Sequence, residues 1–159
     1  MTGPTDAAIL ERAKSLCNEA CYMVLLQRRR LQTIEPEDEV FVFRWWADLQ
    51  FLIIALHRLR RWAHLAADVP SVSNDLQVAI REFDNALPDL AKMRNVGEHI
   101  DDYAVDHPKK RRHRDVDRRQ LQVGKWDGKV FRWLESSPNV DDALKAAEKL
   151  LQAVREAKN

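Results

Sequence analysis

The sequence predicts an all-α fold, an up-and-down bundle of about five helices with a small β-hairpin inserted near residues 119–134. Apolar residues recur at spacings of three and four along most of the chain, which is the helical period. One segment departs from it, because apolar and polar residues alternate on both sides of Asp127-Gly128, a dipeptide typical of tight hairpin turns. The length suits one domain, and we treat residues 1–159 as a single one.

The first two helices are predicted over residues 5–33 and 37–67. Pro36 and the three acidic residues after it are typical of a helix start, because proline fits the first position and carboxylates favour the positive N-terminus. The second helix is apolar over more than half of its circumference, so we expect it at the centre of the bundle. Its large apolar residues are Phe41, Phe43, Trp45, Trp46, Leu49, Leu52, Ile53, Leu56, Leu59 and Trp62.

The rest of the chain is predicted to form three helices and the hairpin. Ser73 or Asn74 can cap one helix, and Pro88 and Pro108 delimit the next. The predicted ranges are 74–87, 88–106 and 140–157 for the helices, 107–135 for a basic loop and the hairpin together, and 119–125 and 129–134 for the strands.

Composition limits the classes of function. The net charge is +1, so no global field attracts nucleic acid or membrane, and a basic site would have to be local. The longest apolar run, residues 51–56, is too short to span a bilayer, and the first residues lack the pattern of a signal peptide. We therefore expect a cytoplasmic protein with no membrane partner.

The sequence predicts no metal and no other cofactor. Cys17 and Cys21 lie four residues apart, but no histidine or further cysteine lies near them, so we interpret them as small buried residues. His57 and His64, seven residues apart on the second helix, have no carboxylate close by in sequence. We interpret them as packed or surface residues, and the run Arg28-Arg29-Arg30 as surface charge that compensates the helix dipole.

Residues 92–106, KMRNVGEHIDDYAVD, carry the candidate site on the predicted fourth helix. Helical spacing places six polar residues on two adjacent stripes. Gly97 lies between them, where glycine costs about 1 kcal/mol relative to alanine and indicates either a tolerated defect or a close approach to the backbone. The stripes hold Asn95, His99 and Tyr103, and Arg94, Glu98 and Asp102.

This set is suited to cleavage of RNA without a metal. An imidazole exchanges protons near neutral pH, and a guanidinium binds a phosphate and stabilises its added charge. His99 would be the acid-base group, Arg94 would bind the scissile phosphate, and Asn95 would orient one of them. One histidine provides only half of the proton transfers, so we expect a homodimer in which Gly97 lets the second helix approach.

The stretch Arg94-Asn95-Val96-Gly97-Glu98-His99 resembles the motif of the HEPN superfamily, in which an arginine, a polar residue and a few more positions precede a histidine. The resemblance implies a bundle of four or five helices and a homodimeric ribonuclease with a composite cleft, often a toxin paired with an antitoxin or a defence protein. It implies that Arg94 and His99 are catalytic, with Asn95 as the polar position after the arginine. We expect Glu98, Asp102 and Tyr103 to surround and support these catalytic residues. A toxin subgroup has a modified tyrosine two residues after the histidine, where this chain has Asp101.

The basic loop and the hairpin each have two interpretations. The loop can contact an RNA backbone without sequence preference, or it can be a solvated surface loop. Trp126 and Trp133 can pin the hairpin to the bundle or stack on a base. The basic residues are Lys109, Lys110, Arg111, Arg112, Arg114, Arg118 and Arg119.

The motif itself also has a second interpretation. Arg94 and Glu98 can form an ordinary surface ion pair, with His99 incidental. The alternative function is then a non-catalytic helical bundle that binds protein or RNA through the same face and the basic loop.

Overall fold

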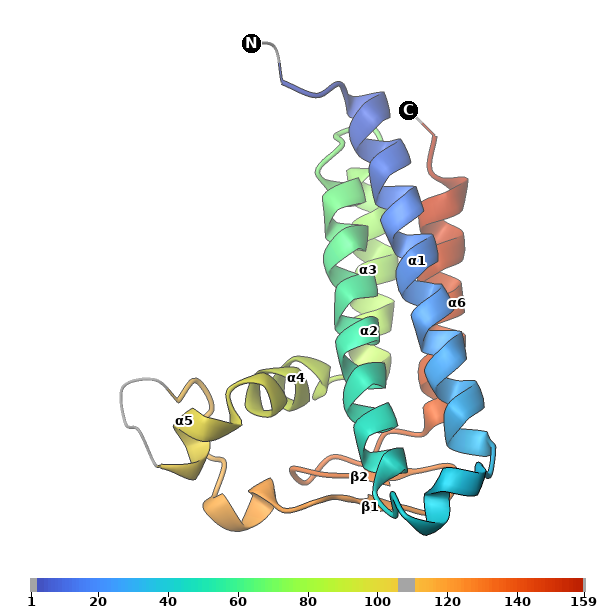
Figure 1. Cartoon of the computed structure of the whole chain (residues 1–159). Coiled ribbons are helices and arrows are strands. Elements are labelled where there is room, and N and C mark those ends of the chain that lie inside the picture. Colours follow the sequence, from blue (N-terminus) through green and yellow to red (C-terminus); the bar gives the residue numbers. More distant parts are fainter. Residues whose placement is uncertain (1–2, 106–110, 159) are drawn as a thin grey trace.

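The computed structural model describes residues 3–105 and 111–158 and confirms the predicted fold class (Figure 1). Four long helices run alternately up and down and form the bundle. Predicted bounds for three of them agree with the structure to within one residue at each end. The bundle helices are α1 (Asp6–Gln32), α2 (Arg44–Ala67), α3 (Ser73–Ala86) and α6 (Val140–Glu156).

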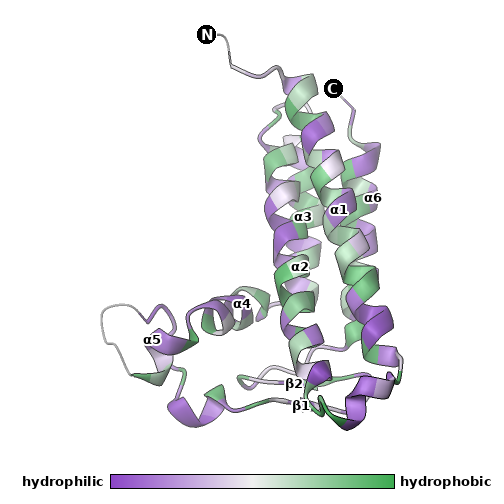
Figure 2. Ribbon diagram, in the orientation of Figure 1, coloured by the Kyte–Doolittle hydropathy of each residue, from purple (hydrophilic) through white to green (hydrophobic). Residues whose placement is uncertain are grey.

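Apolar stripes of the four helices form the core. The hydropathy colouring alternates along each bundle helix, as expected for helices with one buried face (Figure 2). Cys17 and Cys21 are buried in this core, as the sequence predicts, and both are free thiols. Burial raises the pKa of the Cys17 thiol to about 12, so it stays protonated and unreactive at neutral pH.

Between α3 and α6 the chain leaves the bundle. Figure 1 shows α4 running away from α2 across the bundle direction, with α5 at its outer end. We call α4, α5 and the basic segment 111–119 the arm. The elements of this excursion are α4 (Leu90–Glu98), α5 (Ile100–Ala104), the 3-10 helix η2 (Arg118–Leu121), β1 (Lys125–Trp126) and β2 (Phe131–Arg132).

The prediction of one long helix over residues 37–67 is wrong at its start. Pro36–Glu39 form a separate 3-10 helix, η1, and α2 begins only at Arg44. Phe41 and Phe43, expected in the core, are 63% and 57% exposed. The remaining apolar positions of α2 do face its neighbours, with the three tryptophans partly buried against the core.

A buried polar network explains the break before α2. The Arg44 guanidinium donates to the carbonyls of Arg30 and Thr33, at 2.9 and 2.8 Å, and to Asp38. It also donates to Asp48, which lies 2.8 Å away and is only 3% exposed. Arg30 bonds the other oxygen of Asp48, so its interpretation as mere surface charge is wrong. These contacts fold residues 33–43 back over the ends of α1 and α2.

The prediction of one helix over residues 88–106 is also wrong. α4 ends at Glu98, α5 begins at Ile100, and His99 forms the junction with φ −122° and ψ 34°. The kink turns Tyr103 inward, where it is 2% exposed and bonded to Asn95. Its hydroxyl also accepts from the backbone N–H of His113, so the turn into α5 brings the basic segment back against α4. Residue 106 lies outside the described residues.

The hairpin is shorter than predicted. It packs against the bundle through Trp133, in agreement with the first of the two interpretations given above. β1 and β2 pair antiparallel with Trp126 opposite Phe131, whereas residues 119–121, predicted as strand, belong to η2. Trp133 is 4% exposed, and its ring centroid lies 5.2 Å from that of Trp46 on α2. Its burial rules out stacking of Trp133 on a base in this structure. The predicted turn is present, with Gly128 at φ 93°.

Candidate functional site

The arm presents the predicted site residues in three different settings. Arg94 and Glu98 form the expected ion pair, with side chains 32% and 34% exposed. The charge of Arg94 also acts on His57 of α2, so Arg94 lies on the side of α4 near that helix. Residues five apart in a helix are turned by roughly 140°, so Arg94 and His99 do not share a stripe.

Asn95 and Tyr103 act together to hold the basic segment. The Tyr103 hydroxyl donates to Asn95 Oδ1 at 2.7 Å and accepts from the backbone N–H of His113 at 3.1 Å. The Arg111 guanidinium lies over the Tyr103 ring, 5.7 Å from its centroid, and donates to the carbonyl of Val116. The predicted proximity of Asn95 and Tyr103 is confirmed, and in this structure both residues connect α4 to residues 111–116.

His99 is exposed at the junction of α4 and α5, at the outer part of the arm (Figure 1). Its backbone N–H still bonds the carbonyl of Asn95 at 3.1 Å, so the residue closes α4. Asp102, one turn further along, is partly buried on α5. An exposed imidazole in this position can reach a ligand that lies along the arm.

The basic segment is ordered against the arm by specific contacts. Arg118 donates to the carbonyl of Ala104 at 2.6 Å, and Lys92 pairs with Asp115 at 2.7 Å. Arg112 and Arg114 are exposed. Predicted RNA-binding residues Lys109 and Lys110 lie outside the described residues. Arg111, Arg114, Asp115, Val116, Asp117 and Arg118 line a surface cavity of about 330 Å³.

Gly97 does allow a close approach, but the partner is this chain itself. A Cβ atom at residue 97 would lie 2.7 Å from Oε1 of Gln50 on α2 and 3.7 Å from Cη2 of Trp133. The space beside Gly97 is thus filled from α2 and the hairpin. The expectation that Gly97 opens room for a second copy is wrong, because α4 uses this room to pack on its own bundle.

Replacing Gly97 by alanine is expected to change stability by less than about 0.5 kcal/mol, because displacement of the flexible end of Gln50 offsets the gain in helix propensity. In a Gln50→Ala background the clash is absent, and the same substitution should stabilise by about 0.5–1 kcal/mol through helix propensity. Urea denaturation of the four proteins of this cycle measures both effects. An equal effect in the two backgrounds would contradict the assignment of Gln50 as the neighbour of Gly97.

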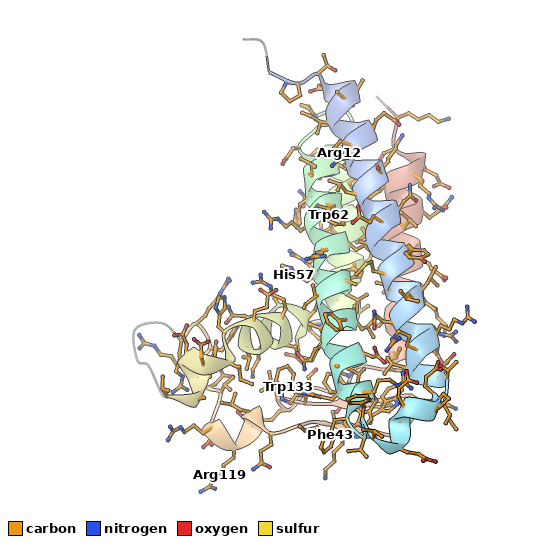
Figure 3. The ribbon with its side chains drawn as sticks, viewed as in Figure 1. Arg12, Phe43, His57, Trp62, Arg119 and Trp133 are labelled. Carbon is orange, nitrogen blue, oxygen red and sulfur yellow. The ribbon has the colours of Figure 1, made fainter. Side chains whose placement is uncertain are left out.

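His57 is a residue of this region that sequence reasoning did not place in the site. It is partly buried on α2, and Figure 3 shows it in the inner corner where α4 leaves the bundle. Burial lowers its pKa most, and the positive charges of Arg94, Arg60 and Arg61 lower it further, while Glu98 raises it. No local pattern indicates this contact, since His57 and Arg94 are far apart in sequence.

Neither metal binding nor membrane insertion is indicated by the described residues. No group of three histidine, cysteine or acidic side chains in them lies close enough to hold a metal ion. None of the described helices combines the length and the apolar content that a membrane span requires. Comparisons with models of protein families, with curated proteins and with solved structures return no match, so the assignment of a function depends on the site itself.

Proposed function

We propose that this chain is a HEPN-like, metal-independent endoribonuclease that acts as a homodimer, in a toxin-like or defence-related role in the cytoplasm. The supporting observation is the anchoring of the basic segment by Tyr103 and Asn95. This contact joins the exposed Arg112 and Arg114 to the helix that carries Arg94 and is followed directly by His99. An RNA backbone bound by these arginines would follow the arm past the motif.

The reaction is attack of a ribose 2′-hydroxyl on the adjacent phosphodiester. His99 removes the hydroxyl proton, the 2′ oxygen bonds to phosphorus, and the bond to the 5′ oxygen breaks. His99 of a second copy protonates the leaving 5′ oxygen, so the products are a 2′,3′-cyclic phosphate and a 5′-hydroxyl end. Arg94 leaves its ion pair with Glu98, binds the phosphate and stabilises the negative charge that the phosphate gains in the transition state.

Cleavage of total RNA in the presence of a chelator tests this proposal. We expect wild-type protein to produce cyclic-phosphate ends, His99→Ala to lower the rate about 10²–10⁴-fold, and Arg94→Ala to lower it about 10²–10³-fold. His64→Ala and Arg12→Ala, on the bundle helices α2 and α1, are matched controls that should retain activity. All variants are compared at equal folded fraction by circular dichroism. Cleavage that survives both motif substitutions would overturn the site.

The alternative, a non-catalytic binding module, is favoured by a different observation. Arg94 and Asn95, two of the three proposed catalytic side chains, already have partners in Glu98 and Tyr103. If wild-type protein binds RNA without cleaving it at any concentration, this alternative holds. Each lost phosphate contact should then reduce the salt dependence of binding by about 0.7 on logarithmic axes for single strands, measured with Arg112→Ala and Arg114→Ala.

An antitoxin partner is part of the toxin-like role. Asp101 stands where the toxin subgroup has its modified tyrosine, and the tyrosine that follows it two residues later, Tyr103, is buried and bonded to Asn95. Control by modification of that tyrosine therefore has no accessible target here. An antitoxin of this chain would have to act by covering the arm.

A further inference from the structure

RNA cleavage needs one group that removes a proton and another that supplies one, and the motif contains a single histidine. The proposed homodimer meets this need with two copies of His99. The structure offers a second histidine within the same chain, in the corner between α2 and α4 (Figure 3). The inference below depends on the proposed function and changes which residue acts as the base.

The packing of α4 on α2 defines this corner. Gly97 of α4 lies against Gln50 of α2, as the position of its missing Cβ shows. Gln50 and His57 are seven residues apart, two helical turns, and so lie on the same side of α2. Arg94 is one turn from Gly97 towards the start of α4, on the side where its charge acts on His57. His57 and Arg94 therefore lie on the facing sides of the two helices, close enough for the charge of Arg94 to act on His57.

The charges around His57 suit a base that acts on a phosphodiester. Arg60 and Arg61 on α2 and Arg94 on α4 are positive, and Glu98 on α4 is the negative charge that faces it. Burial and the arginines together lower its pKa, so the imidazole is neutral at pH 7 and can accept a proton. The same arginines attract an RNA phosphate to the corner.

We propose that His57 is the general base of this ribonuclease and works beside Arg94 in the corner between α2 and α4. Arg94 leaves Glu98 and binds the scissile phosphate. His57 takes the proton of the 2′-hydroxyl as the 2′ oxygen bonds to phosphorus. The bond to the 5′ oxygen breaks, and His99 of the second copy in the proposed homodimer supplies the proton that this oxygen takes.

The first test separates the base from the acid. His57→Ala should lower kcat/KM about 10²–10⁴-fold at pH 7, with His64→Ala, two turns further along α2, as the unaffected control. A substrate whose 5′ oxygen is replaced by sulfur has a leaving group that needs no acid. It should restore cleavage by His99→Ala but not by His57→Ala. The assignment would be overturned if the sulfur-containing substrate restored cleavage by His57→Ala, or if His57→Ala cleaved ordinary RNA as fast as wild type.

The pH profile gives a second readout of the same role. Activity depends on neutral His57, so kcat/KM should fall on the acid side only below about pH 6.5, the ordinary histidine pKa. This acid limb should disappear in His57→Ala. An acid limb unchanged in the variant would contradict the role of His57.

Binding without turnover distinguishes failure of this inference from failure of the proposed function. With a 2′-O-methyl RNA oligonucleotide, which cannot react, the NMR signal of the His57 ring should shift and its pKa should rise as the phosphate approaches. His64 should not respond, and Arg94→Ala should abolish the shift. Wild-type cleavage without this shift would overturn the inference and leave the ribonuclease standing. A shift of the His57 signal without any cleavage of ordinary RNA would overturn the proposed ribonuclease function. The corner between α2 and α4 would then be a phosphate-binding site only.

Discussion

Replacing Arg44 by methionine is expected to lower the free energy of unfolding by roughly 3–5 kcal/mol, the cost of removing one partner from a buried ion pair. The Asp48 side chain is 4% exposed, and that of Arg44 is 11% exposed. Without Arg44, the Asp48 carboxylate keeps only its contact with Arg30, and the carbonyls of Arg30 and Thr33 lose a donor. Urea denaturation followed by circular dichroism measures the loss.

Two comparisons make this prediction specific. Arg60→Met breaks a pair with Asp84 in which both side chains are about one third exposed, and it should cost only about 1 kcal/mol or less. The double variant Arg44→Met/Asp48→Leu removes the stranded charge and should regain part of the loss. Equal losses for Arg44→Met and Arg60→Met would show that burial of the network contributes nothing.

Replacing Gly124 by alanine should destabilise the hairpin by about 1–3 kcal/mol, the usual cost of overpacking. The added Cβ would lie 2.6 Å from the backbone oxygen of Arg132, 2.8 Å from Cε2 of Phe131 and 3.1 Å from Cζ3 of Trp46. A backbone oxygen in a paired strand cannot move alone, so β2 must shift away from α2. Tryptophan fluorescence should move to longer wavelength as the indole rings of Trp46 and Trp133 become hydrated.

The control for this substitution is Gly3→Ala. Nothing lies within 4 Å of a Cβ atom at Gly3, so this change should leave stability and fluorescence unaltered. A Gly124 variant as stable as the Gly3 variant would mean that the hairpin adjusts to the extra methyl group without cost. Such a result would contradict the tight packing of β1 and β2 on α2.

The motif on α4 was predictable in part, for local reasons. The Arg94–Glu98 pair follows from i,i+4 spacing, and the contact of Asn95 with Tyr103 agrees with the predicted stripe even though the helix breaks between them. Sequence reasoning took the helix to be straight, because nothing in the helical spacing of residues 88–106 signals the break at His99. The buried ring and its bond to the backbone of His113 come from residues that only the fold brings together.

The sequence by itself determined the all-α class, the bundle helices and the hairpin turn. These features depend on the apolar period and on turn chemistry within a few residues, such as the Asp127 carboxylate that accepts the N–H groups of Lys129 and Val130. Tertiary structure alone decided the start of α2, the direction of the arm and the placement of His57 within the field of Arg94. Each of these features depends on charged or aromatic side chains whose interaction partners are distant in sequence. Such partners come together only when the helices pack.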